Sequence, residues 1–140
     1  MTPTQIMLVK NSFQAAAPQR RRLAPIFFSE LFAREPSLRA LFSGDVSAHG
    51  TALFQGLSAI VGSLARLHPI MPALEWLALR NARRGLREYH YEAFGEALLA
   101  ALEQGLGEAF TADTRQAWTA AHAKVARLML DSLPAEALAA

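Results

Sequence analysis

The positions of proline and glycine constrain the fold of this chain more than any other feature of the sequence. They divide an alanine- and leucine-rich chain into pieces of helix length. Within each piece the apolar residues recur three and four positions apart, as on one face of a helix. No piece alternates apolar and polar residues as a half-buried strand does. The sequence therefore predicts an all-α fold.

The prolines, glycines and capping residues also predict where the helices begin and end. Thr2 or Thr4 can cap a first helix, with Pro3 in its first turn and Pro18 at its end or at the start of the next. Pro25 should make the second helix start late or kink. The remaining boundaries predict helices to about residue 35, from Pro36 to near Phe42, and over 48–66, 72–84, 89–105 and 112–132, with Pro134 marking the end.

Length and composition narrow the class of protein. The 140 residues predict one domain spanning 1–140, and 52% of them are hydrophobic. There is no cysteine, so disulfides and thiolate metal sites are excluded. The net charge of +2 does not favour nucleic acid, and the cluster Arg20-Arg21-Arg22 lacks stacking aromatic partners. We see neither a membrane span nor a signal peptide and expect a cytoplasmic protein.

A set of residues at fixed intervals then points to one family. Pro36 opens the short third helix and Phe42 follows six residues later, His49-Gly50 comes next, and Leu53 lies one helical turn beyond. The stretch 80–99 continues in the same register, as do Leu106-Gly107-Glu108-Ala109 and Ala117-Trp118. The chain resembles the globins over essentially its whole length, most of all single-domain bacterial haemoglobins and the haem domain of flavohaemoglobins. The resemblance implies a three-over-three helical sandwich.

The resemblance fails at positions that carry function in the family. Asn81 stands where the proximal histidine that holds the haem iron is expected, and Leu133 stands where its glutamate partner is expected. Phe28 replaces the tyrosine that usually donates to bound oxygen. Tyr91 of the proximal wall is kept, and His90 beside it is not an iron ligand in the family. A carboxamide is a poor iron ligand, although it can hydrogen-bond a water on the iron.

What the resemblance implies is a haem b site with weakened or unusual iron ligation. His49 is then the histidine over the porphyrin and the expected metal ligand, with His49 and Asn81 on opposite sides of one apolar slot. Arg80, Arg83 and Arg84 lie near the propionates. The cofactor-binding set is Phe28, Phe42, His49, Leu53, Arg80, Asn81 and Tyr91.

Without the family resemblance, these residues would be interpreted as ordinary structural residues. A lone histidine on an apolar face is more often structural than a ligand, and on spacing alone His49 would be one of these. His68 reads as a loop residue and His122 as a structural one. The aromatic stripe would be read as core; it comprises Phe27, Phe28, Phe32, Phe42 and Phe54.

Two functions of different classes follow. The first is a haem protein that binds or senses a diatomic gas, oxygen or nitric oxide. The second is a haem-free globin acting as a regulatory or interaction module. We expect no enzyme and no catalytic residue, because no flavin or NAD domain is present and the proximal pair that activates bound oxygen is lost. The sequence leaves the oligomeric state open, with a homodimer as one possibility.

Overall fold

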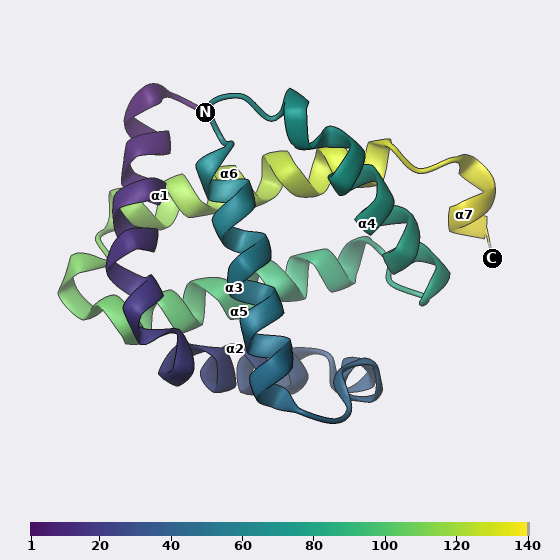
Figure 1. Ribbon diagram of the computed structural model, residues 1–140, viewed down its shortest axis with the longest axis horizontal. Coiled ribbons are helices and arrows are strands. Elements are labelled where there is room, and N and C mark those ends of the chain that lie inside the picture. Colours follow the sequence, from purple (N-terminus) through teal and green to yellow (C-terminus); the bar gives the residue numbers. More distant parts are fainter. Residues whose placement is uncertain (140) are drawn as a thin grey trace.

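The computed structural model describes residues 1–139, and the side chains of all of these except 46, 138 and 139. Figure 1 shows an all-helical molecule, and the described residues contain no strand, which confirms the predicted class. The elements in chain order are α1 (Pro3–Ala16), η1 (Ala17–Gln19), α2 (Arg20–Arg34), η2 (Pro36–Phe42), α3 (Val46–Gly62), η3 (His68–Ile70), α4 (Met71–Arg83), α5 (Glu88–Leu106), η4 (Gly107–Ala109), α6 (Ala112–Asp131) and α7 (Ala135–Ala139).

Side chains that accept hydrogen bonds from free backbone N–H groups set the helix starts. Thr2, not Thr4, caps α1: its hydroxyl accepts from the Gln5 N–H, and the Gln5 side chain accepts in return from the Thr2 N–H. The Asp45 carboxylate accepts from the Ser47 N–H at 2.9 Å, so α3 begins two residues before the predicted residue 48. Thr111 caps α6 as predicted.

Three predicted boundaries need correction. The α3 helix ends at Gly62 rather than near 66, and residues 63–65 continue as a turn. Pro25 does not delay α2, which already begins at Arg20. Pro134 does not end the helical part of the chain, because α7 follows it and the Pro134 carbonyl accepts the Ala137 N–H. A proline that precedes a helix loses no hydrogen bond there, since the first N–H groups have no partner within the helix.

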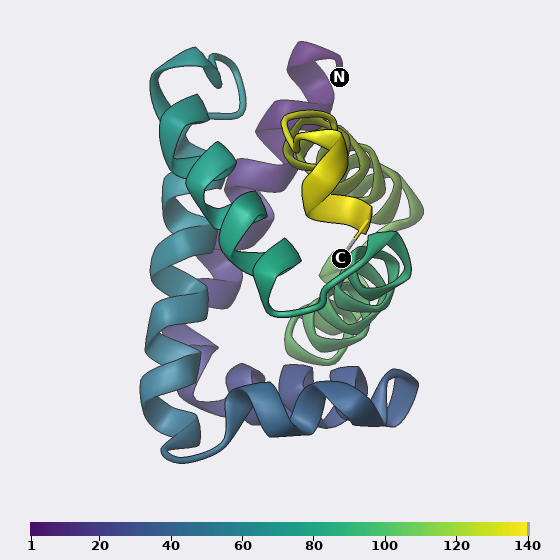
Figure 2. The ribbon, with the colours of Figure 1, turned by 90° about the vertical axis from the view of Figure 1, so that its right-hand side faces the viewer.

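The α2 helix lies along one edge of the molecule in both ribbon views (Figure 1, Figure 2). Its principal neighbours are α5 and α3, while α1 packs on α6 and α5 packs on α6. The α4 helix packs on α6, η3 and α7, and Figure 2 shows α4 and α7 together at one end of the molecule. This arrangement leaves α4 attached mainly through α6 and α7.

The core is divided into two clusters. The main cluster joins α1, α2, α3, α5 and α6, and its most deeply buried side chains include Val9, Leu23, Phe27, Leu31 and Leu64. A smaller cluster of Leu74, Ala78 and Met129 holds α4 to α6. Ile60 and Val125 touch both clusters. The side of α4 that carries position 81 is therefore stabilised separately from the main core.

We predict that Gly50 is required for the close approach of α2 and α3. A Cβ at position 50 would lie 2.7 Å from the Ala24 Cβ, whereas one at Gly56, in the same helix, meets nothing within 4 Å. Gly50→Ala should therefore destabilise the fold by about 1–3 kcal/mol. The matched Gly56→Ala should be neutral or stabilising by up to about 1 kcal/mol. Urea unfolding of both variants checks this, and equal midpoints would contradict it.

Candidate functional site

Four rings gather where α2, η2 and α3 meet. The ring centroids of Phe28 and Phe42 are 5.2 Å apart, and that of His49 lies 5.5 Å from Phe42 and 6.4 Å from Phe28. Phe32 stacks on Phe28 at 5.9 Å. Phe28 is buried, while Phe42 and His49 remain partly exposed. The structure thus brings together three of the predicted site residues, Phe28, Phe42 and His49.

The imidazole of His49 is engaged by its own loop. Its Nε2 lies 3.0 Å from the carbonyl oxygen of Ser43. A carbonyl oxygen only accepts, so Nε2 carries the proton and the lone pair of the neutral ring is on Nδ1. Sequence reasoning did not foresee this bond. A metal bound through Nε2 would have to displace Ser43, which costs one hydrogen bond near the surface.

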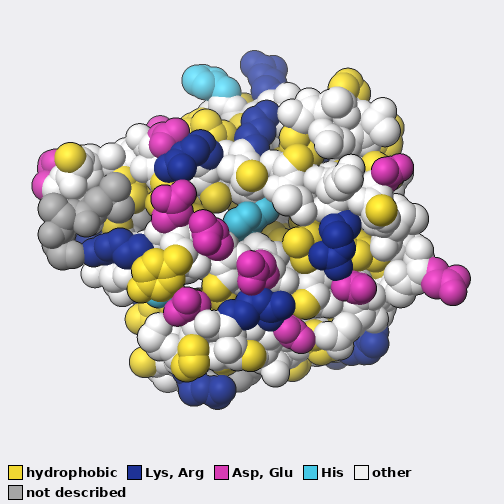
Figure 3. All heavy atoms as spheres, turned by 180° about the vertical axis from the view of Figure 1, so that it is seen from behind, with side chains coloured by type: hydrophobic (Ala, Val, Ile, Leu, Met, Phe, Trp, Pro, Cys, Tyr) yellow, Lys and Arg dark blue, Asp and Glu magenta, His cyan; other side chains and the backbone are white. Residues whose placement is uncertain are grey.

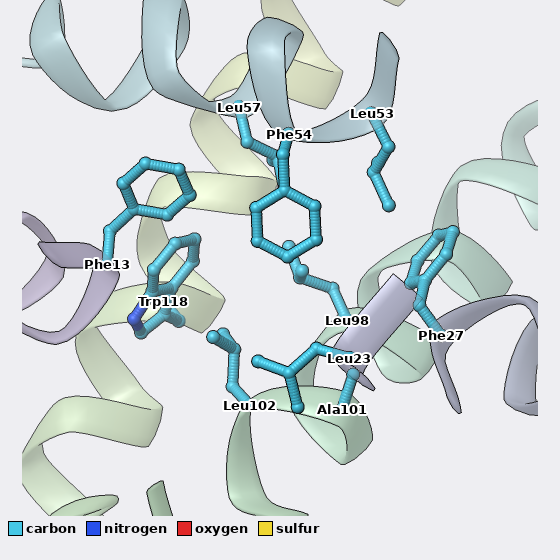
Figure 4. A pocket seen from close by; sticks show the side chains of 10 residues that line it. All are labelled: Phe13, Leu23, Phe27, Leu53, Phe54, Leu57, Leu98, Ala101, Leu102 and Trp118. Atoms are coloured by element: carbon cyan, nitrogen blue, oxygen red, sulfur yellow. The ribbon is translucent and has the colours of Figure 1, made fainter. Parts of the chain in front are cut away.

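Leu53, one turn beyond His49, points toward the centre of the molecule. Together with Phe27 and Leu98 it lines an enclosed apolar void of about 10 Å³, and Figure 4 shows these side chains around a common space. That volume is close to the least that a single water needs, and the lining offers no polar partner, so we expect the void to be dry.

On α4, Asn81 is paired with Tyr91 of α5. The Asn81 Nδ2 donates to the Tyr91 hydroxyl at 3.3 Å, and both side chains are partly buried. Burial raises the pKa of Tyr91, and the hydrogen bond from Asn81 opposes that rise. The amide is therefore oriented by a phenol that stays neutral at physiological pH.

Leu133, at the position where the resemblance expects a glutamate, belongs to the smaller apolar cluster. It packs beside the cluster of Leu74, Ala78 and Met129, as do Leu77 and Tyr91. A carboxylate at this place would be partly desolvated among apolar side chains, so leucine suits these surroundings.

Two stripes of partly exposed side chains lie beside the buried faces of α3 and α4. Helical spacing puts His49, Leu53 and Ile60 on one side of α3, next to the buried Phe54, Leu57, Val61 and Leu64. Leu77 and Asn81 form the corresponding pair on α4, next to the buried Leu74 and Ala78. We call these the α3 stripe (His49, Leu53, Ile60) and the α4 stripe (Leu77, Asn81). In both stripes some side-chain surface therefore remains exposed beside the buried core.

Arginines gather at the C-terminal end of α4, where positive charge complements the helix dipole. Arg84 donates from Nη2 to the Leu41 carbonyl at 2.8 Å and so ties α4 to η2. The Arg80 guanidinium lies over the exposed Trp76 ring, 5.6 Å from its centroid, and Arg83 is exposed. The bond to Leu41 and the stacking on Trp76 could not be predicted from the sequence.

The other histidines have structural surroundings. His68 is exposed on η3. His90 is buried, and its Nδ1 accepts the Arg87 N–H at 2.8 Å at the start of α5, a capping role that sequence reasoning missed. His122 lies between α5 and α6, stacked on Phe94. Among the residues that the structure describes, no three His, Cys, Asp or Glu side chains come together as a metal site.

Comparison with known proteins identifies the family. The globin family model matches residues 26–129, so the chain belongs to the globin family and the predicted globin fold is confirmed. A flavohemoprotein of Vibrio cholerae is 25% identical over 134 residues, 94% of this chain and 34% of the relative. One from Bordetella parapertussis is 29% identical, covering 93% of this chain and 33% of the relative. The chain thus spans about a third of the length of these relatives.

Solved structures agree with this assignment. An engineered carbene transferase derived from a putative nitric oxide dioxygenase of Rhodothermus marinus superposes with a TM-score of 0.80 at 26% identity, covering 92% of this chain and 90% of that one. A bacterial globin from Campylobacter jejuni gives 0.81 at 22% identity, covering 94% and 95%. Within the described residues no helix is both long and apolar enough to cross a bilayer.

We predict that His122 makes stability depend on pH. Burial lowers the pKa of this imidazole, and a hydrogen bond to the Tyr91 backbone opposes that shift. Its folded-state pKa is therefore below the unfolded value of 6.5, and stability falls as pH drops through that value. Urea unfolding from pH 8 to 5 should show a loss of at most about 1.4 kcal/mol per pH unit from this group. His122→Gln should reduce the slope, and equal slopes in the parent and in this variant would contradict the assignment.

Proposed function

We propose that this globin binds haem b between the α3 stripe and the α4 stripe and serves to bind or sense a diatomic gas, oxygen or nitric oxide. The observation that carries the proposal is the incomplete burial of both stripes beside a core that is divided in two. When bound, haem would supply the iron centre at which such a gas binds. The gas-binding relatives lend support, since flavohemoproteins carry haem by name.

The residues of the two stripes are better suited to contact the porphyrin ring than to ligate the iron. The partly exposed Phe42 and Leu53 offer it apolar surface on one side, and Leu77 and Tyr91 offer it on the other. Covering apolar surface is worth roughly 25 cal/mol per Å² before the costs of ordering, so such surface alone can retain a porphyrin. The void beside Leu53 is too small for it. Binding would therefore require space beside Leu53 that the void does not provide, and α4 is packed chiefly on α6, η3 and α7.

For the iron we propose His49 as the principal ligand. Its neutral imidazole is a far better donor than the Asn81 amide. To ligate through Nε2 the ring has to release the Ser43 carbonyl. Asn81, held by Tyr91, would then present its remaining polar atoms to a gas from the α4 side. Arg83, which is exposed near the end of α4, would pair with a propionate, and Arg80 would do so by leaving Trp76.

The rival function is a haem-free regulatory or interaction globin. The Asn81–Tyr91 hydrogen bond and the apolar packing of Leu133 favour it, because they give the altered positions partners that need no cofactor. We propose no catalysis for either form. The cytoplasm remains the proposed location.

Titration of the apo-protein with haemin tests the leading proposal. We expect a saturable one-to-one Soret spectrum whose spin state reports whether an imidazole holds the iron. His49→Ala should weaken haem binding roughly tenfold or more, since the proposed iron–imidazole bond is lost. His68→Ala, on exposed η3, is the matched control and should bind as the parent does. If the parent shows no saturable spectrum, the role of a haem-free regulatory or interaction module becomes the better-supported function. An unchanged spectrum and affinity in His49→Ala would exclude ligation by His49.

A second variant tests position 81 from the opposite side. Asn81→His places an imidazole on the α4 stripe where the family carries its ligand, so the ferrous protein should show a five-coordinate histidine spectrum with an iron–imidazole stretch in resonance Raman, provided that His49 does not also bind. The change also removes the hydrogen bond to Tyr91, and unfolding measurements report that cost separately. A spectrum identical to that of the parent would show that position 81 does not face the iron.

A further inference from the structure

A groove of about 390 Å³ lies between α5 and α6, away from the α3 and α4 stripes. Figure 3 shows that acidic, basic and hydrophobic side chains meet in the middle of this face of the molecule. The imidazole of His122 takes the place that a side chain at Gly95 would fill, since a Cβ there would be 2.7 Å from two ring atoms. The groove is thus a feature of how α5 and α6 pack.

Half of the residues that line the groove are apolar or small, and the other half are polar or charged. Tyr91 and Leu99 are partly exposed and contribute apolar surface, while the small side chains of Ala123 and Ala126 leave room on the α6 side. Ala123 and Thr119 are exposed. An elongated apolar surface flanked by small residues accommodates the apolar face of a helix.

One rim of the groove carries a regular row of carboxylates. Glu88, Glu92 and Glu96 follow one another at intervals of four residues along α5, about 6 Å apart in rise. Arg127 is the one Lys or Arg in the lining, so the groove is acidic although the whole chain carries a net charge of +2. Glu88 pairs with Arg127 and Glu96 with Arg34, whereas Glu92 makes no ion pair with any residue that the structure describes.

We propose that this groove docks a cationic amphipathic helix of a partner protein. Lysine or arginine residues four positions apart on the partner would match the rise of the glutamate row, and its apolar face would cover the partly exposed Tyr91 and Leu99. The exposed ion pairs to Arg127 and Arg34 present no obstacle, because exposed pairs contribute little and exchange readily. Of the residues assigned to the proposed haem site only Tyr91 also lines the groove, and the docking proposal does not require haem.

A designed peptide tests the proposal on the full chain. The probe is a labelled leucine–lysine peptide of about 18 residues with period-3.6 patterning, and its counterpart carries glutamate in place of lysine. Fluorescence anisotropy should show saturable binding of the lysine peptide that weakens with salt, and no binding of the glutamate peptide. The ring-proton NMR signals of His122 should shift on binding, while those of His68 should not.

Variants of groove residues test whether the peptide binds in the groove. Glu92→Gln disturbs no described ion pair and should weaken binding roughly two- to fivefold. Ala123→Arg, at an exposed position, should weaken it further by filling and charging the groove. Glu75→Gln on α4 removes an exposed carboxylate elsewhere and should have no effect. Equal binding to all variants, or none to the parent, would overturn the proposal. So would concentration-dependent dimerisation in sedimentation that Ala123→Arg abolishes, since a second copy would then be the occupant.

Discussion

The burial of α2 is the constraint on which the rest of the structure depends. Leu23, Phe27 and Leu31 are each only 1% exposed, and helices from both sides close on them. The approach is possible because glycines stand at the contacts: a Cβ at Gly50 would meet Ala24, and one at Gly105 would meet the end of Leu23. With α3 and α5 fixed in this way, the ring of His49 is brought to Phe28 and Phe42.

The same packing explains which features could be predicted from the sequence. The helical class, the cap at Thr111 and the gathering of Phe28, Phe42 and His49 follow from periodicity and from the globin register, because both report which side of a helix a residue occupies. The hydrogen bond from His49 to Ser43, the tie from Arg84 to Leu41 and the cap by His90 could not be predicted. They depend on rotamers and loop geometry that spacing does not determine. Likewise α7 was missed, since a proline reads equally as an end or a start.

The two functions considered for this globin differ in what covers the α3 and α4 stripes. A haem would cover both and draw His49 away from Ser43. A haem-free protein would keep the amide of Asn81 on Tyr91 and leave the stripes to a different occupant. The groove between α5 and α6 contains none of the stripe residues and meets the haem site only at Tyr91, the hydrogen-bond partner of Asn81.

The independent attachment of α4 has a consequence for how such a sequence can change over time. Leu74, Ala78 and Met129 hold this helix by contacts between protein side chains alone. The position of α4 therefore does not rely on a bond from residue 81 to a metal. A substitution at 81 therefore costs the fold mainly the hydrogen bond to Tyr91 and leaves the apolar contacts of α4 in place. A globin built in this way can exchange or lose its proximal ligand in a single mutational step and still inherit an intact scaffold, on which a new function can be selected.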